Sequence, residues 1–170
     1  MARVYLGLGA NVGDRRANLR DALSRLAPVV RTEKVSSLYE TPALSTPEVG
    51  DQPDFLNAVV RAATSLRPDA LLRHVKTVER DAGRRPGLRW APRPLDIDIL
   101  LYDDQQLESD ELTIPHAGLL ERIFVLAPLS ELAPELSLPG GTVTVAEALA
   151  ALPAQEIARL EGPQWAALEP

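Results

Sequence analysis

The sequence predicts an α+β domain on the ferredoxin-like split β-α-β plan: an α/β plait whose antiparallel sheet and packed helices form three layers, α-β-α. Its 170 residues are enough for one compact domain. Because 45% of them are hydrophobic and 25% are charged, the chain can bury an apolar core. Strand and helix patterns follow in the order β-α-β-β-α-β, which places the helices mainly on one face of the sheet. We expect one domain over residues 1–170, with a core over about residues 2–152 and a C-terminal tail over 153–170.

The first half of this pattern is a strand, a helix and two strands. Val4 to Gly9 is apolar and ends at a glycine, which predicts the first strand, and Asp14 can cap the helix that follows. The apolar stripe of that helix has helical spacing and consists of Leu19, Ala22, Leu23 and Leu26. Residues 34–39 and 55–64 predict two more strands, and the loop of Pro, Ser and Gly between them, residues 41–53, is long enough to suggest function or mobility.

The second half is a helix and a strand. Pro68 fits the first turn of a helix and Gly83 fits its end. Its spacing predicts an inward face of Leu71, Leu72, Val75, Val78 and Ala82, and an outer face of Lys76, Glu79 and Arg80. The segment LDIDILLY, residues 95–102, predicts a strong strand.

Weaker patterns follow this strand. Short helices are expected near residues 119–131 and 145–152, and Thr144 with Glu147 forms a capping box for the second of them. The tail from Pro153 to Pro170 predicts only surface helix or coil.

Composition excludes several classes of protein. The chain has no cysteine and two histidines, which excludes disulfides, thiolate metal sites and cysteine nucleophiles and leaves carboxylates as the expected metal ligands. No stretch approaches the ~18 apolar residues of a membrane span, and the N-terminal residues lack a cleavage-like site. We therefore expect a soluble, cytoplasmic protein that does not bind membranes.

Charge is distributed unevenly along the chain. The net charge is -6, yet the window from Arg73 to Arg93 holds seven basic residues against two acidic ones. This favours a local site for a small phosphorylated ligand over a surface that binds nucleic acid.

Asp96 and Asp98 are the most informative pair. Residues two apart on a strand point to the same face, so these two carboxylates converge while Ile97 and Ile99 point to the other face. Mg²⁺ is commonly held by one or two carboxylates together with substrate phosphates. The alternative is a solvated edge strand with acidic residues that discourage aggregation.

An arginine-rich loop, RRPGLRWAPRP, leads directly into this acidic strand. Its Arg84, Arg89 and Arg93 can bind phosphate oxygens, and Trp90 can cover a base. Seen alone, such a loop is more often simply solvated. Beside paired acids, it favours a site for magnesium and a polyphosphate.

Other motifs of nucleotide and metal sites are absent from the sequence. Gly7, Gly9 and Gly13 are spaced one residue too far for the dinucleotide fingerprint, and no P-loop or EF-hand loop occurs. The glycines are better explained as a closely packed strand end that turns into a helix. Neither His74 nor His116 lies beside a nucleophile elbow, which argues against a serine hydrolase.

Two of the seven aromatic residues lie beside polar loop residues. Phe55 and Phe124 can grip a flat heterocycle, and the amide of Asn57 can pair with its edge. His116 can contact a phosphate or a ribose. The alternatives are core packing for both phenylalanines and a structural role for the histidine.

Together these motifs resemble the 6-hydroxymethyl-7,8-dihydropterin pyrophosphokinases of folate biosynthesis. The resemblance covers most of residues 4–136, and its most specific part is RWAPRPLDIDIL followed by TIPH and RIFVLAPL. The matching strings are LGLGANVGD, SSLYETPAL, QPDFLNAVV, GRRPGLRWAPRPLDIDILLY, LTIPHAGLLERIFVLAPL and ELAPEL.

The resemblance implies an enzyme that transfers the β,γ-diphosphoryl group of ATP to the hydroxymethyl oxygen of the pterin and releases AMP. Two Mg²⁺ ions would be held by Asp96 and Asp98, and the catalytic set would be Arg84, Arg93 and these two carboxylates. The implied ATP-binding residues are Lys76, Glu79, Arg84, Trp90, Arg93, Ile99, Thr113, His116 and Arg122. The implied pterin-binding residues are Thr41, Pro42, Leu44, Phe55, Asn57 and Phe124.

The chain departs from the family pattern at a few of its positions. Phe55 replaces a frequent tyrosine, which keeps the stacking face and loses a hydroxyl, and Lys76 stands where glutamine is familiar. Glu111 stands where an arginine can occur, and Ala117 replaces a tyrosine or proline. These departures affect contacts to adenosine and ribose rather than the reaction.

Two other functions fit parts of the sequence. A nucleic-acid-binding module could share the split β-α-β plan, but no strand carries the aromatic signature of such RNA binders. A magnesium-dependent phosphotransferase could act on another small heterocyclic alcohol, and it would differ in releasing ADP rather than AMP. We expect the chain to act as a monomer, with a weak dimer as the alternative.

Overall fold

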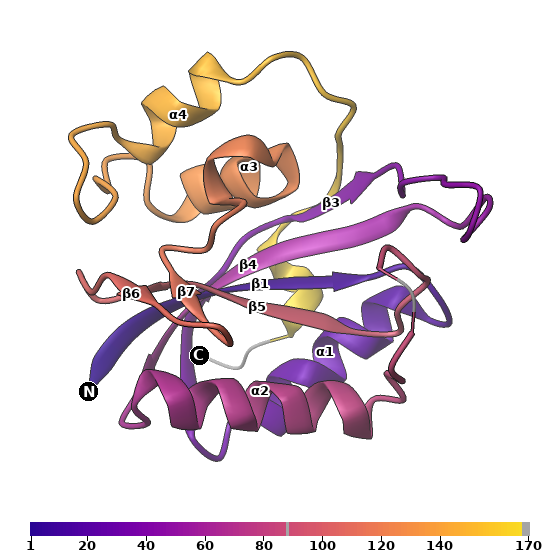
Figure 1. The fold of residues 1–170 in the computed structure, drawn as a ribbon, viewed down its shortest axis with the longest axis horizontal. Coiled ribbons are helices and arrows are strands. Elements are labelled where there is room, and N and C mark those ends of the chain that lie inside the picture. Colours follow the sequence, from indigo (N-terminus) through magenta and orange to yellow (C-terminus); the bar gives the residue numbers. More distant parts are fainter. Residues whose placement is uncertain (88, 168–170) are drawn as a thin grey trace.

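The computed structural model describes residues 1–87 and 89–167 and has three layers (Figure 1). A β-sheet lies in the middle, α1 and α2 cover one face, and α3 and α4 cover the other. The predicted α+β fold with layers α-β-α is therefore confirmed, although the helices are not confined mainly to one face. The helices are α1 (Arg15–Leu26), α2 (Pro68–Asp81), α3 (Ile123–Leu132) and α4 (Val145–Ala151).

Every strand pair in the sheet is antiparallel. The order along the sheet is β5-β1-β4-β3-β8, with β2 paired to β4 beside β3, and β6 and β7 form a separate hairpin. The strands are β1 (Ala2–Ala10), β2 (Val30–Val35), β3 (Leu38–Thr41), β4 (Phe55–Thr64), β5 (Asp96–Tyr102), β6 (Leu107–Glu108), β7 (Thr113–Ile114) and β8 (Ala158–Glu161).

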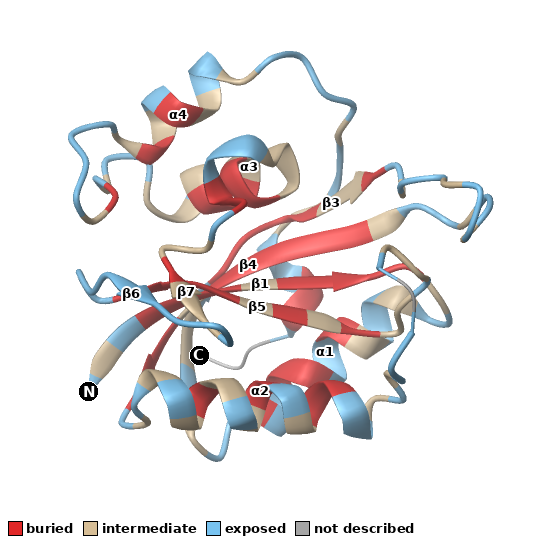
Figure 2. Cartoon of the chain, viewed as in Figure 1, coloured by how far each residue is buried: buried red, intermediate tan, exposed pale blue. Residues whose placement is uncertain are grey.

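The core consists of two apolar clusters, one on each face of the sheet (Figure 2). Ile97 and Ile99 of β5 belong to the cluster under α1 and α2, whereas Leu100 belongs to the cluster under α3 and α4. Burying each such side chain contributes about 1.5–3 kcal/mol. None of the helices in the described residues is both long and apolar enough to cross a membrane.

The predicted helix ends are confirmed. The side chain of Asp14 accepts a hydrogen bond from the Ala17 amide at 3.0 Å, and Thr144 with Glu147 forms a capping box. Pro68 lies in the first turn of α2, and Gly83 follows the helix with φ of 99°. Such caps satisfy backbone groups that a helix end leaves without a partner.

The prediction of one strand over residues 34–39 is wrong, because the chain forms two strands there. β2 and β3 both pair with β4 and are separated by Ser36 and Ser37, which are fully buried. The Ser36 hydroxyl accepts from the Val59 amide at 2.9 Å, and the Ser37 amide donates to the Glu131 carboxylate at 3.0 Å. The Ser36 amide still donates to the Val59 carbonyl at 2.9 Å, and the serine side chains supply the remaining bonds, so both buried serines keep hydrogen-bond partners.

The prediction that the tail forms only surface helix or coil is also wrong. β8 extends the sheet beside β3, and a short 3₁₀ turn, Pro163–Ala166, follows it. Trp165 in that turn is fully buried in the α1 and α2 cluster, and its indole donates to the Ser36 carbonyl at 2.7 Å. Residues beyond 152 therefore contribute to the core.

Candidate active site

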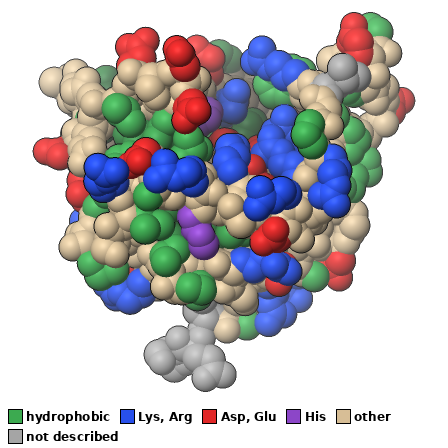
Figure 3. Space-filling view, turned by 60° about the horizontal axis from the view of Figure 1, so that its bottom comes forward, with side chains coloured by type: hydrophobic (Ala, Val, Ile, Leu, Met, Phe, Trp, Pro, Cys, Tyr) green, Lys and Arg blue, Asp and Glu red, His purple; other side chains and the backbone are tan. Residues whose placement is uncertain are grey.

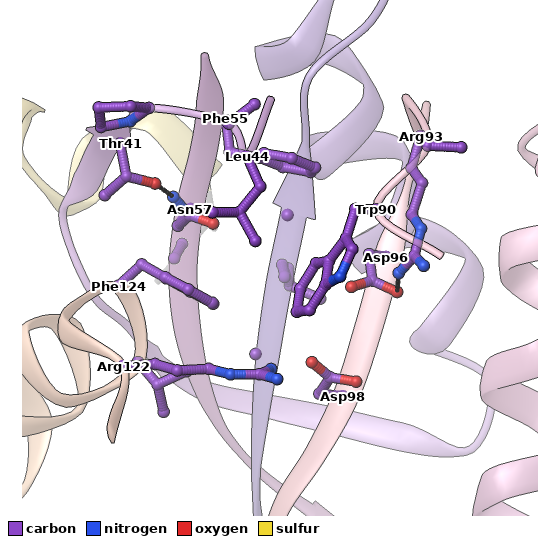
Figure 4. Close-up of a pocket in the computed structure, with 18 of the residues that line it drawn as sticks. Thr41, Leu44, Phe55, Asn57, Trp90, Arg93, Asp96, Asp98, Arg122 and Phe124 are labelled. Atoms are coloured by element: carbon purple, nitrogen blue, oxygen red, sulfur yellow. Dashed lines mark hydrogen bonds and ion pairs between the residues drawn. The ribbon is translucent and has the colours of Figure 1, made fainter. Parts of the chain in front are cut away.

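A pocket of about 270 Å³ opens on the α3 side of the sheet (Figure 4). Its floor is formed by β1, β4 and β5, and its rim by the loop after β3, the loop before β5 and the start of α3. The predicted site residues that line it are Thr41, Pro42, Leu44, Phe55, Asn57, Trp90, Arg93, Asp96, Asp98, Arg122 and Phe124. The fold thus brings together residues that lie up to 83 positions apart in the chain.

Asp96 and Asp98 lie on the same face of β5 and point into the pocket (Figure 4). Their side chains are 24% and 29% exposed, whereas Ile97 between them is buried in the core. The residues opposite them on β1 are Gly9 and Gly7, so no side chain from β1 fills the space beside the carboxylates. This confirms the shared face that the spacing predicts and shows that the site has room for a ligand.

Gly9 also leaves room for the apolar half of the pocket. A Cβ atom at Gly9 would lie 3.4 Å from the Asn57 side-chain oxygen and 3.7 Å from the Phe55 ring. Asn57 is 5% exposed, and its amide donates to the Thr41 hydroxyl at 2.9 Å. That bond fixes the orientation of the amide, which lies beside Phe55 and faces Phe124 across the pocket (Figure 4).

Two arginines neutralise Asp96. Arg84 Nη1 lies 2.6 Å and Arg93 Nη1 lies 3.2 Å from Asp96 Oδ1. All three side chains are about one-quarter exposed, so these contacts are less screened by water than surface ion pairs. Arg84 does not line the pocket itself, but its bond to Asp96 places it at the edge of the site.

Glu79 was expected on the outer face of α2, and this prediction is wrong. It is 2% exposed because α2 packs this position against β5, where its carboxylate accepts from the Ile97 amide at 2.7 Å and from Arg84. Lys76 lies 3.2 Å away on the solvent side. Burial raises the pKa of Glu79, while the Ile97 amide, Lys76 and Arg84 oppose that rise. Glu79 is thus a buried partner of Arg84.

His116 faces the other carboxylate. Its Nε2 lies 3.7 Å from Asp98 Oδ1, and its Nδ1 accepts from the Gly118 amide at 3.1 Å, so the proton on a neutral ring belongs on Nε2. Burial raises the pKa of Asp98, but the adjacent His116 and the charges of Arg122 and Lys76 outweigh it and leave the pKa below its usual value. Asp98 is therefore ionised at neutral pH and available to bind a cation.

Only three of the nine residues implied for ATP line the pocket, namely Trp90, Arg93 and Arg122. Besides Lys76, Glu79, Arg84 and His116, whose positions are given above, two more do not. The Ile99 side chain is buried in the core on the opposite face of β5, and Thr113 lies in the β6–β7 hairpin. Neither lines the pocket that holds the carboxylates. Their place beside adenosine remains a prediction.

Sequence reasoning missed Asn11 and Gln52, which join the loops around the site. Gln52 Nε2 donates to the Leu44 carbonyl at 2.9 Å and to the Trp90 carbonyl at 2.7 Å, and its Oε1 accepts from Asn11 at 2.7 Å. Asn11 in turn accepts from the Arg93 amide at 2.8 Å. Both residues occur in the strings ANVGD and QPDF, but nothing local in the sequence shows that they meet.

Trp90 is held in a left-handed backbone conformation, with φ of 68°. Such a conformation costs of order 1–3 kcal/mol for a residue with a side chain, and residues held in this way cluster at functional sites. The Arg89 guanidinium lies 4.7 Å from its ring centroid, and the Gln52 bond holds its carbonyl. The indole ring thereby forms one wall of the pocket (Figure 4).

Basic side chains also gather outside the pocket. Lys and Arg residues cluster on the face formed by α2 and the loop that follows it (Figure 3). The exposed members are Arg73, Lys76, Arg80, Arg85 and Arg89. This local positive field attracts anionic ligands toward the site, although the whole chain has a net charge of -6.

Known proteins with a similar fold include a crystal structure of Plasmodium falciparum HPPK-DHPS with SDX-DHP. It matches with a TM-score of 0.68 and 17% identity, over 88% of this chain and 43% of that one. At this identity the match shows the fold alone.

Other known proteins are much more similar to this chain in sequence. The chain is 44% identical to the Methylorubrum extorquens 2-amino-4-hydroxy-6-hydroxymethyldihydropteridine pyrophosphokinase, over 95% of this chain and 100% of that protein. It is 43% identical to the Aquifex aeolicus protein of the same name, over 82% and 85%. It is 49% identical to the mitochondrial folate synthesis bifunctional protein of Arabidopsis thaliana, of which it spans only 23%.

A family model described as 7,8-dihydro-6-hydroxymethylpterin-pyrophosphokinase matches residues 5–134. That range contains the pocket, both carboxylates and both loops around them. The chain therefore belongs to the 7,8-dihydro-6-hydroxymethylpterin-pyrophosphokinase family.

Proposed function

We propose that this pocket transfers the β,γ-diphosphoryl group of ATP to the hydroxymethyl oxygen of 6-hydroxymethyl-7,8-dihydropterin, with the residue roles given below. As a member of its family, the chain is a pyrophosphokinase of folate biosynthesis. One observation carries the proposal: paired carboxylates, Asp96 and Asp98, share a single pocket with two aromatic rings and a buried amide. That combination suits a substrate pair with a charged part and a flat heterocycle.

The carboxylate pair fits Mg²⁺. The described residues contain no group of three or more His, Asp or Glu that could hold a metal alone. Mg²⁺ needs only one or two carboxylates when phosphates and water complete its octahedron. Asp96 and Asp98 are about one-quarter exposed and lie beside Gly9 and Gly7, which leaves space for such ligands. We propose that they hold two Mg²⁺ ions, which when bound would neutralise the charge of the triphosphate.

The arginines and His116 would bind phosphate oxygens. Arg84 and Arg93 already lie at Asp96, and their guanidinium groups can turn to bind oxygens in pairs. The pterin hydroxyl oxygen attacks the β-phosphorus and gives its proton to water, the bond from that phosphorus to the α,β-bridging oxygen breaks, and AMP leaves with that oxygen. Such a transfer depends on in-line placement and charge stabilisation more than on a covalent nucleophile.

The apolar half of the pocket would bind the pterin. Phe55 and Phe124 lie on β4 and α3, where their rings can stack on the two faces of a heterocycle. Asn57, oriented by Thr41, would pair with the edge of the ring, and Pro42 and Leu44 would cover it. The contacts of Lys76, Glu79, Trp90, Ile99, Thr113 and Arg122 with the nucleotide are further parts of this proposal.

We also propose that residues 1–170 act as one domain and as a monomer in the cytoplasm, without binding nucleic acid or membrane. The pocket holds both carboxylates, both phenylalanines and Asn57, so this chain supplies residues for the charged part and for the flat part of the substrates. The net charge of -6 disfavours the binding of a polyanion such as nucleic acid over most of the surface.

Product analysis tests the reaction. The protein, incubated with ATP, magnesium and the hydroxymethyl dihydropterin, should release AMP in an amount equal to the pterin diphosphate formed. Omission of the pterin is the control for simple ATP hydrolysis. Release of ADP would instead indicate a phosphotransferase for another heterocyclic alcohol, and absence of turnover would reject the assignment.

The loops at residues 44–51 and 83–92 are expected to close when both substrates bind. Closure would exclude water, which competes with the alcohol for the phosphorus. Amide hydrogen exchange in both loops should slow when magnesium, a non-hydrolysable ATP analogue and the pterin are added together. Exchange in β4 serves as the internal reference. Equal exchange in the loops with and without ligands would contradict the expectation.

A further inference from the structure

The Arg122 side chain extends from the start of α3, beside Phe124, toward Asp98 (Figure 4). Its guanidinium lies 5.7 Å from the Phe124 ring centroid and 5.9 Å from the Trp90 ring centroid. Within the described residues, this guanidinium has no hydrogen bond or ion pair of its own. Its donors are therefore free to bind an anionic ligand.

The backbone at Arg122 needs support from elsewhere in the chain. Arg122 is extended, with φ of -119° and ψ of 112°, between a 3₁₀ turn, Leu119–Glu121, and the first residue of α3. It makes no side-chain cap for α3, so the first amides of the helix lack intrahelical partners. An extended residue between two helical segments could otherwise adopt several orientations.

Gln155, from the tail, supplies that support with a single amide group. Its Oε1 accepts from the Ile123 amide at 3.2 Å, and its Nε2 donates to the Glu121 carbonyl at 3.2 Å. The two bonds hold the residues immediately before and after Arg122. Gln155 is itself exposed and lies outside the range that the family model matches.

Gly118 supports the side chain of Arg122 in a different way. A Cβ atom at Gly118 would lie 2.6 Å from Arg122 Nε and 2.7 Å from its Cζ, distances that non-bonded atoms do not tolerate. The φ of Gly118 is -92°, which any residue can adopt, so the backbone does not require glycine. The position needs to be small only because the Arg122 side chain passes over it.

We propose that Gln155 and Gly118 are positioning residues that together aim the Arg122 guanidinium into the pocket. Gln155 fixes the backbone from which the side chain starts, and Gly118 leaves open the path along which it runs. This inference rests on the proposed function, because placing Arg122 matters for turnover only if its guanidinium binds a phosphate between the aromatic rings and Asp98.

Single and paired substitutions test the proposal. Gly118→Ala and Gln155→Ala should each lower kcat/KM about tenfold, as expected for a misplaced charge-assisted hydrogen bond. Arg122→Ala should lower it at least as much. Added to Arg122→Ala, neither of the other substitutions should cause further loss, because residues that act through one side chain are not additive. Glu156→Ala, at the exposed neighbour of Gln155, is the matched control.

Tryptophan fluorescence gives a readout that does not depend on turnover. The chain has two tryptophans. Trp165 is buried on the face of the sheet opposite the pocket, whereas the Arg122 guanidinium lies 5.9 Å from the Trp90 ring centroid. A change in emission on moving Arg122 therefore reports on Trp90. Gly118→Ala and Gln155→Ala should reproduce the emission change caused by Arg122→Ala.

Two results would overturn the positioning role: activity and emission equal to those of the unmodified protein, or losses that add fully to that of Arg122→Ala. If the unmodified protein released no AMP, the proposed function would fail. The emission of the variants would then still show whether Gly118 and Gln155 place Arg122.

Discussion

Asp98→Ala is expected to reduce turnover by about a thousandfold while the chain remains folded. The carboxylate lies on the pocket face of β5 opposite Gly7, it is ionised at neutral pH, and it would be one of two protein ligands for magnesium. Loss of a metal clamp should cost several kcal/mol of transition-state stabilisation, and about 1.4 kcal/mol corresponds to each factor of ten. Asp96→Ala should have a similar effect on turnover.

Stability should respond differently from activity. Asp98 is 29% exposed and outside both apolar clusters, so its removal leaves the core intact. Asp96→Ala also releases Arg84 and Arg93, but both arginines can reach water. We expect a change of less than about 1 kcal/mol in the free energy of unfolding for Asp98→Ala.

The measurement is AMP release at saturating ATP and pterin, with thermal unfolding followed by circular dichroism. Asp104→Ala is the matched control, because Asp104 lies in the exposed turn after β5 and outside the pocket. It should keep full activity. Retention of more than about a tenth of the rate by Asp98→Ala or Asp96→Ala would show that the metal role is misplaced.

The strands and the acidic pair could be predicted because they depend on local periodicity. Alternate residues of a strand share a face whatever the rest of the chain does, so DIDIL places both carboxylates together and both isoleucines in the core. Caps follow the same logic, since Asp14 and Thr144 bond to amides three residues further along the chain. Such features need no information from distant segments.

Glu79 shows why other features could not be predicted. Polarity places a glutamate on the solvent face of a helix, and charged residues are almost never fully buried unless they are paired. Its partners, Arg84 and the Ile97 amide, belong to a loop and a strand that meet α2 only in the folded chain. The resemblance to a family placed Glu79 in the site, but periodicity alone placed it outside.

The break between β2 and β3 has the same origin. Residues 34–39 carry no turn residue that would divide a strand, and the two buried serines at the centre depend on partners such as Val59 and Glu131 from other parts of the chain. Asn11 and Gln52 likewise meet across 41 residues of chain. Each of these features depends on hydrogen bonds between distant segments, which spacing along the sequence does not reveal.

Trp165→Ala is expected to have the largest effect on stability. Trp165 is fully buried among the apolar residues under α1 and α2, although it lies five residues from the C-terminus of a 170-residue chain. Truncating a buried aromatic ring to alanine costs about 3–5 kcal/mol, because apolar contacts are lost and a cavity remains. The Ser36 carbonyl also loses its indole donor, which leaves a buried acceptor beside the break between β2 and β3.

Trp165→Phe separates these two contributions. It keeps most of the ring and removes the 2.7 Å bond to Ser36, so the loss should be smaller than for alanine and should include about 1–3 kcal/mol from the unpaired carbonyl. Urea unfolding followed by circular dichroism measures both variants, with the exposed Gln164→Ala as control. If Trp165→Ala unfolded within about 1 kcal/mol of the unmodified protein, residues beyond 152 would not be part of the core. Most domains have only about 5–15 kcal/mol of stability, so a loss of the expected size would also lower the amount of active enzyme. Trp165 would thus affect activity although it lies on the face of the sheet opposite the catalytic pocket.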